Sequence, residues 1–126
     1  MTRQALVIED DADIRALVAF KLRQADFEVA EEGDGEAGLA AATSIEPDVI
    51  LLDWMMPKLS GIEVLLRLRA TESTASIPVI MLTARAQESE IERGFAAGAD
   101  DYIVKPFSPR ELQSRVEAVL NRAMHS

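Results

Sequence analysis

Five charged or hydroxyl side chains stand where short apolar runs of the chain end: Glu9, Asp10, Asp53, Thr83 and Lys105. Unbroken apolar runs of this kind, bounded by Pro or Gly, are typical of strands that are buried on both faces of a parallel sheet. The carboxyl ends of parallel strands lie at one edge of the sheet, where the following loops line a crevice. We therefore expect these five side chains to gather in one pocket, although any one of them alone would more often be a helix cap or a surface residue.

The three acids would repel one another in such a pocket, so the site either raises a carboxyl pKa or binds a cation. Oxygen ligands without His or Cys favour Mg²⁺, with Mn²⁺ as an alternative, over zinc. Lys105 would supply a positive charge for a phosphoryl group, and the Thr83 hydroxyl could donate to one of its oxygens. Because a carboxylate can also attack phosphorus and form an acyl phosphate, the pattern favours phosphoryl transfer.

Strand and helix patterns alternate along the chain five times. The expected strands cover residues 5–8, 27–30, 49–52, 79–82 and 102–104, and helical spacing follows each of them. The apolar helix positions are Ile14, Leu17, Val18 and Leu22, then Ile62, Leu65 and Leu66, then Ile91 and Phe95, and finally Leu112, Val116, Val119 and Leu120. Short connections between alternating elements imply right-handed crossovers. The fold class is therefore α/β: a flavodoxin-like, doubly wound, five-stranded parallel sheet of order 2-1-3-4-5 with five helices.

Composition limits the function further. The chain has 126 residues, which fits one domain, and its 13 basic and 22 acidic residues give a net charge of −9 that disfavours direct binding to nucleic acid. No cysteine, signal peptide or apolar stretch of about 20 residues occurs in it, so we expect a cytoplasmic protein that does not enter a membrane.

Four motifs mark the carboxyl ends of the expected strands: VIEDD at 7–11, LLDWMMPKLSG at 51–61, MLTA at 81–84 and GADDYIVKPFSPREL at 98–112. Together they make the chain resemble a response regulator receiver domain of two-component signalling, most closely of the OmpR/PhoB class. Each motif is weak alone, but all four in this order and spacing are highly specific. The resemblance implies a CheY-like fold in which residues 1–122 form the receiver domain and 123–126 form a tail or the start of a linker.

The resemblance also assigns the metal and phosphoacceptor roles. Asp53 is similar to the aspartate that these domains phosphorylate. Asp10, Asp53 and the backbone carbonyl of Met55 would bind Mg²⁺ directly, and Glu9 would act through a water molecule. Thr83 matches the hydroxyl residue that contacts the phosphoryl group.

Lys105 and Tyr102 complete the set that the resemblance implies. Lys105 would contact the phosphoryl group, and the Lys105–Pro106 bond is expected to be cis. A sensor histidine kinase would phosphorylate Asp53, after which Thr83 would move inward and Tyr102 would rotate into the vacated space. In the OmpR/PhoB class the altered surface forms a symmetric homodimer that brings DNA-binding effector domains together. DNA is thus an expected partner only through an effector domain that this chain lacks.

This chain keeps some of the charged residues that form the dimer face in the OmpR/PhoB class. Those retained are Asp100, Asp101, Glu111, Arg115 and Arg122. However, Ile91 stands where the class has a base, Ala96 where it has an acid, and Glu117 where it has a base. Losing one member of an ion pair can leave the other uncompensated, so the usual dimer would be weakened or would depend more on apolar contact through Ile91.

Three other functions are compatible with parts of the pattern. A stand-alone, CheY-like or phosphorelay receiver would act through a protein target. A Mg²⁺-dependent aspartyl phosphohydrolase of the haloacid dehalogenase type is disfavoured, because it needs an acid where this chain has Met55. A flavodoxin-like nucleotide or flavin binder is disfavoured because no Gly-rich loop follows the first strand. The favoured interpretation is a switch, not an enzyme, which catalyses only its own phosphorylation and dephosphorylation.

Overall fold

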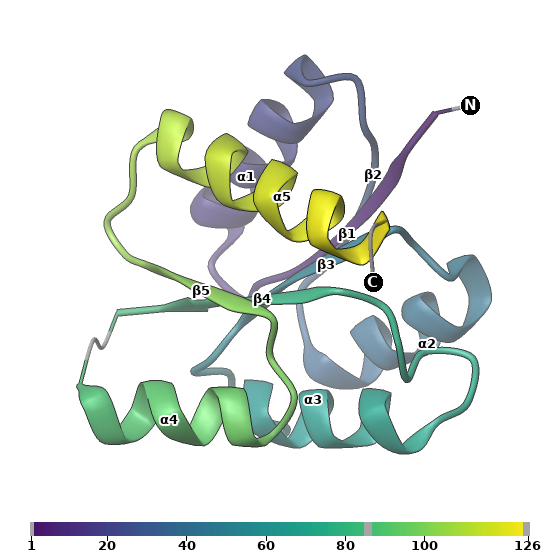
Figure 1. Ribbon diagram of the computed structural model, residues 1–126, viewed down its shortest axis with the longest axis vertical. Helices are drawn as coiled ribbons and strands as arrows, with labels where there is room; N and C mark the ends of the chain where they lie inside the picture. The colour runs from purple at the N-terminus through teal and green to yellow at the C-terminus, as the bar shows by residue number, and fades with distance from the viewer. Residues whose placement is uncertain (1, 85–86, 125–126) are drawn as a thin grey trace.

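The computed structural model describes residues 2–84 and 87–124 and has a parallel sheet between two layers of helices (Figure 1). Its five described strands are β1 (Gln4–Ile8), β2 (Glu28–Glu32), β3 (Val49–Asp53), β4 (Val79–Thr83) and β5 (Asp101–Val104). They are all parallel and lie in the order β2-β1-β3-β4-β5. The predicted fold class and strand order are therefore confirmed.

The described helices are α1 (Ala12–Gln24), α2 (Gly35–Ile45), α3 (Gly61–Ala70), α4 (Glu88–Ala96) and α5 (Pro109–Met124). Helices α1 and α5 cover one face of the sheet, and α2, α3 and α4 cover the other (Figure 1). No helix among the described residues has the length and apolar character that crossing a bilayer requires.

Two apolar clusters, one on each face of the sheet, form the core. Because successive strand residues point to opposite faces, Leu6 and Ile8 of β1 pack toward α2 and α3, whereas Val7 packs toward α1 and α5. All five residues of β3 and of β4 are buried. The central strands consequently need apolar side chains on both faces, which explains their unbroken apolar runs.

Local capping fixes where the helices begin. The Asp11 side chain accepts hydrogen bonds from the N–H groups of Asp13 and Ile14, so Asp11 is the N-cap of α1. Ser60 and Glu63 form a complete capping box at α3, which the sequence analysis did not identify. This cap starts α3 only a short distance after the end of β3.

The Lys105–Pro106 bond is cis, as expected from the family resemblance. At the start of α5, Ser108 Oγ accepts a hydrogen bond from the Glu111 N–H at 3.1 Å. Helix α5 extends through Met124. Of the predicted tail, residues 123–124 are thus helical, and residues 125–126 lie outside the described part of the chain.

Three helix positions that were predicted to be core are exposed: Leu17 by 45%, Leu66 by 52% and Phe95 by 44%. In each case a neighbour takes the core-facing place on the helix. Ala19 is buried in α1, Val64 in α3 and Gly94 in α4. Each exposed residue thus lies beside the buried face of its helix, which includes Val18 and Leu22 in α1 and Ile62, Leu65 and Leu68 in α3.

Candidate functional site

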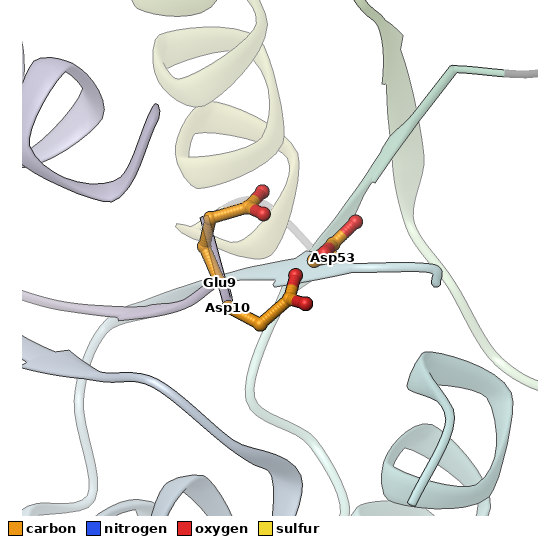
Figure 2. Close-up of side chains that lie close together, drawn as sticks. All are labelled: Glu9, Asp10 and Asp53. Atoms are coloured by element: carbon orange, nitrogen blue, oxygen red, sulfur yellow. The ribbon is translucent and has the colours of Figure 1, made fainter. Parts of the chain in front are cut away.

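The acidic pocket forms where β1 and β3 end side by side. Ile8 pairs with Leu52, so the residues that follow these strands are neighbours at the same edge of the sheet. The carboxylates of Glu9, Asp10 and Asp53 converge there (Figure 2), and each offers an oxygen within 4.8 Å of the others. Since all three donors are hard oxygen ligands, the cluster fits a divalent cation.

Burial differs among the three acids. Glu9 is fully buried and Asp53 is 3% exposed, whereas Asp10 is exposed. The Asp11 N–H donates to Glu9 Oε1 at 3.2 Å, and the Met55 N–H donates to Asp53 Oδ1 at 3.4 Å. The site thus has two poorly hydrated carboxylates and one that solvent reaches.

Lys105 brings the compensating charge from β5. Its Nζ donates to Glu9 Oε2 at 2.8 Å and to Asp53 Oδ1 at 3.1 Å. Its backbone N–H donates to the Thr83 carbonyl at 2.7 Å, which fixes the strand end from which the side chain extends. One ammonium group therefore serves two buried carboxylates.

A single positive charge does not balance this pocket. Burial, together with the hydrogen bonds and charges of the nearby Glu9 and Asp10, raises the pKa of Asp53 to about 8, although Lys105 opposes the change. Burial also lowers the pKa of Lys105, but its hydrogen bond to Glu9 and the charge of Asp53 outweigh this effect and raise it overall. A protonated Asp53 beside a charged Lys105 is the expected state at neutral pH until another cation enters.

Thr83 and Tyr102 lie on adjacent strands beside the acidic pocket. Thr83 ends β4 and is 3% exposed. Tyr102 is half-buried on β5, and its ring centroid lies 5.9 Å from that of Phe95 in an edge-to-face arrangement with an interplanar angle of 79°. The Arg115 guanidinium lies over the Tyr102 ring, 5.6 Å from the ring centroid. The tyrosine ring is thus held between α4 and α5.

The response regulator receiver domain model matches residues 5–117 of the chain. The chain belongs to this family. It is 48% identical over 122 residues to the phosphate regulon transcriptional regulatory protein PhoB of Escherichia coli, an alignment that covers 97% of this chain and 53% of PhoB. The receiver domain spans about half the length of the curated relatives that it matches.

Solved structures agree with this assignment. The chemotaxis protein CheY4 of Vibrio cholerae has a TM-score of 0.91 and 32% identity, with 94% of this chain and 99% of that one covered. The receiver domain of the sensor histidine kinase PA1611 from Pseudomonas aeruginosa has a TM-score of 0.88 and 30% identity, covering 96% and 99%. The latter structure is described with a magnesium ion coordinated in its active site cleft.

Several charges of the predicted dimer face are paired within the receiver domain itself. Arg115 Nη1 donates to Asp101 Oδ1 at 3.0 Å, and Arg115 Nη2 lies 3.6 Å from Glu111 Oε2. Arg122 is 3.9 Å from Asp101 Oδ2 and also donates to the Asp100 carbonyl at 3.3 Å. A dimer that used these residues would therefore exchange internal pairs for external ones.

Arg69 is a residue that the sequence analysis missed. Its Nε and Nη2 donate to the Gly98 carbonyl at 3.0 and 2.8 Å, and its Nη1 donates to the Ile77 carbonyl at 2.7 Å. Nη2 also donates to Asp100 Oδ2 at 3.0 Å, and the same oxygen accepts from the Val79 N–H at 2.8 Å. Asp100 thus helps to join the start of β4 to the end of α4. No sequence motif marks this arginine, because its partners are backbone carbonyls of distant loops.

The departures at positions 117, 91 and 96 have different surroundings. Glu117 accepts two hydrogen bonds from Arg3 at 2.8 and 3.1 Å. A basic residue at position 117, which is typical of the class, would instead repel Arg3. Ile91 is half-buried and Ala96 is exposed on α4. Only Glu117 is explained by a contact within the described chain.

The raised pKa of Asp53 predicts a pH-dependent gain in stability for Asp53→Asn without divalent cations. Between pH 3.8, the ordinary value, and about 8, the unfolded chain loses this proton while the folded chain keeps it, so wild-type stability falls as pH rises. Asp53→Asn has no carboxyl group at this position, so its stability does not fall with pH for this reason. At pH 8 and above we expect its free energy of unfolding to exceed that of wild type by at least about 1.4 kcal/mol, the equivalent of one pKa unit.

Urea unfolding from pH 4 to 9 measures this difference. The exposed Glu72→Gln is the matched control and should show no such pH trend. A difference between Asp53→Asn and wild type that does not grow with pH would contradict the assignment.

Proposed function

We propose that this chain is the phosphoaccepting receiver of a two-component response regulator and that Asp53 takes a phosphoryl group from a sensor histidine kinase. The observation that carries the proposal is the convergence of Glu9, Asp10 and Asp53 with the Lys105 ammonium at the carboxyl edge of the sheet. Family membership and the PhoB relative support it independently.

The chemistry is a transfer between two side chains. A carboxylate oxygen of Asp53 attacks phosphorus, the bond between phosphorus and the kinase histidine nitrogen breaks, and that nitrogen regains the electron pair. Lys105 lies where it can neutralise a phosphoryl oxygen, and the Thr83 hydroxyl ends the neighbouring strand. These residues position charge and need not exchange protons during the transfer.

A Mg²⁺ ion, or Mn²⁺, fits the donor set of the pocket. Asp10, Asp53 and the Met55 carbonyl would hold it directly, with Glu9 acting through a water molecule. When bound, the ion would favour the ionised form of Asp53 and offset the negative charge of the phosphoryl oxygens. The raised pKa of Asp53 supports this contribution at neutral pH.

The output would be a change of the surface formed by α4, β5 and α5. Thr83 would engage the phosphoryl group, Tyr102 would turn inward, and the paired charges around Arg115 and Asp101 would rearrange. By its resemblance to the OmpR/PhoB class, this surface would form a homodimer that controls a transcription-factor effector, and the similarity to a transcriptional regulatory protein supports the effector type. The proposal includes a cytoplasmic location, since the kinase phosphohistidine and DNA are both encountered there.

A stand-alone receiver that signals through a protein target is the second candidate, supported by the similarity to CheY4. An aspartyl phosphohydrolase is disfavoured, because Met55 occupies the position of its second acid. The non-enzymatic assignment is part of the proposal, and turnover of small phosphate esters would contradict it.

Phosphoryl uptake tests the proposal. With acetyl phosphate and Mg²⁺, intact-mass spectrometry should show one phosphoryl group for each chain. Asp53→Asn should take up none, chelation of Mg²⁺ should abolish uptake by wild type, and the exposed Glu72→Gln should behave like wild type. Equal labelling of Asp53→Asn and wild type, or no labelling of wild type, would overturn it.

Met55 predicts slow loss of the phosphoryl group. Its side chain is 58% exposed beside Asp53, where it would crowd the path of an attacking water. We expect Met55→Asn to lose phosphate about tenfold faster than wild type, which corresponds to about 1.4 kcal/mol of activation free energy. Met55→Leu keeps an apolar side chain of similar size and should remain slow. Equal rates in wild type and Met55→Asn would exclude this role.

Oligomeric state separates the two receiver candidates. Light scattering with and without beryllofluoride, a phosphoryl mimic, should show a dimer only with the mimic if the chain serves a transcription factor. Asp53→Asn should remain monomeric in both conditions. A wild-type chain that is monomeric throughout would favour the stand-alone receiver.

A further inference from the structure

The side chain of Trp54 connects the phosphoacceptor strand with α4. Trp54 directly follows Asp53 and is only 9% exposed. Its backbone is fixed on both sides, because its N–H donates to the Leu82 carbonyl and its carbonyl accepts from the Gly61 N–H, each at 2.9 Å. The indole consequently extends under α4 from a rigid backbone position.

Gly94 is the residue of α4 that faces this indole. A Cβ atom at position 94 would lie 2.9 Å from Trp54 Cζ3 and 3.4 Å from Trp54 Cη2. The first distance is too short for a real contact, so either the ring or the helix would have to move. Glycine at this position allows α4 to lie directly on the outer edge of the indole.

The space that Tyr102 would need lies beside this contact. Trp54, Gly94, Thr83 and Tyr102 line a cavity of only about 10 Å³, about enough for one water molecule. An inward rotation of the tyrosine ring cannot be accommodated there unless the indole or α4 is displaced. Because β4 and Gly61 hold the backbone of Trp54, such a displacement falls on the indole ring or on α4.

We propose that Trp54 is a positioning residue: its indole, seated against Gly94, sets the height of α4 above the sheet and transmits the state of Asp53 to the α4 surface. This inference rests on the proposed function. It assigns Trp54 no contact with the phosphoryl group. The transmission is mechanical, because the ring fills the volume that Thr83 and Tyr102 must share with α4.

The first experiment measures amide hydrogen exchange of residues 88–96 in Gly94→Ala, alone and combined with Trp54→Leu. Alanine favours helix more than glycine, so Gly94→Ala should protect α4 where nothing opposes it. In the wild-type background the new methyl group meets the indole, and α4 protection should instead fall at least threefold. In the Trp54→Leu background, which lacks Cζ3 and Cη2, the same change should raise protection. The exposed α4 variant Glu92→Ala should show no reversal of sign.

The second experiment repeats the exchange measurement after treatment with acetyl phosphate and Mg²⁺, with uptake recorded by mass spectrometry. We expect phosphorylation to change α4 exchange at least threefold in wild type and less than half as much in phosphorylated Gly94→Ala. Among the phosphorylated Trp54 variants, Trp54→Phe should keep at least half of the wild-type response and Trp54→Leu should lose it. The comparison of Trp54→Phe with Trp54→Leu does not depend on Gly94→Ala, so it still tests the inference if Gly94→Ala does not fold.

The outcomes separate this inference from the proposed function. A wild-type chain that takes up no phosphoryl group overturns the proposed function and the transmission together. Normal uptake with a full α4 response in Gly94→Ala and Trp54→Leu overturns the transmission alone. Increased protection by Gly94→Ala in both backgrounds overturns the positioning contact.

Discussion

The sharing of one lysine by two buried carboxylates is the interaction on which the rest of the site depends. Lys105 Nζ lies 2.8 Å from Glu9 and 3.1 Å from Asp53, and Asp10 adds a third acid at the solvent side. Burial raises the pKa of Asp53, the neighbouring Glu9 and Asp10 add to this, and the single charge of Lys105 does not offset it. An arrangement of this kind favours whatever supplies positive charge to Asp53, and it makes the charge state of one side chain sensitive to what enters the pocket.

A rigid scaffold is needed to hold these like charges together. The fully buried strands β3 and β4 fix the backbone on which Asp53 and Thr83 stand, and the Thr83 carbonyl holds the N–H of Lys105. On the α4 side, Arg69 joins the loops that precede β4 and β5. The backbone therefore keeps these charged residues together at one edge of the sheet.

The fold and the acidic pocket could be predicted because they follow from chain-wide regularities. Buried parallel strands require apolar runs, and the strand order places Glu9 beside Asp53 whatever the helices do in detail. The exposure of Leu17, Leu66 and Phe95 could not be predicted in this way, because it depends on which side of each helix packs against the sheet. The contacts of Arg69 and Glu117 depend on residues distant in sequence and carry no local signal. The capping box of Ser60 and Glu63 did have a local signal, S-x-x-E, that was overlooked.

Proton release on Mg²⁺ binding tests the central electrostatic claim most directly. If Asp53 is protonated in the free pocket, a cation that binds its carboxylate must displace that proton. Calorimetric titration in buffers of different ionisation enthalpy should therefore show release that approaches one proton for each ion bound near pH 7 and disappears well above pH 8, the region of the Asp53 pKa. Mg²⁺ binding to wild type near pH 7 without proton release would contradict the account, because Asp53 would then already be ionised beside Glu9 and Asp10.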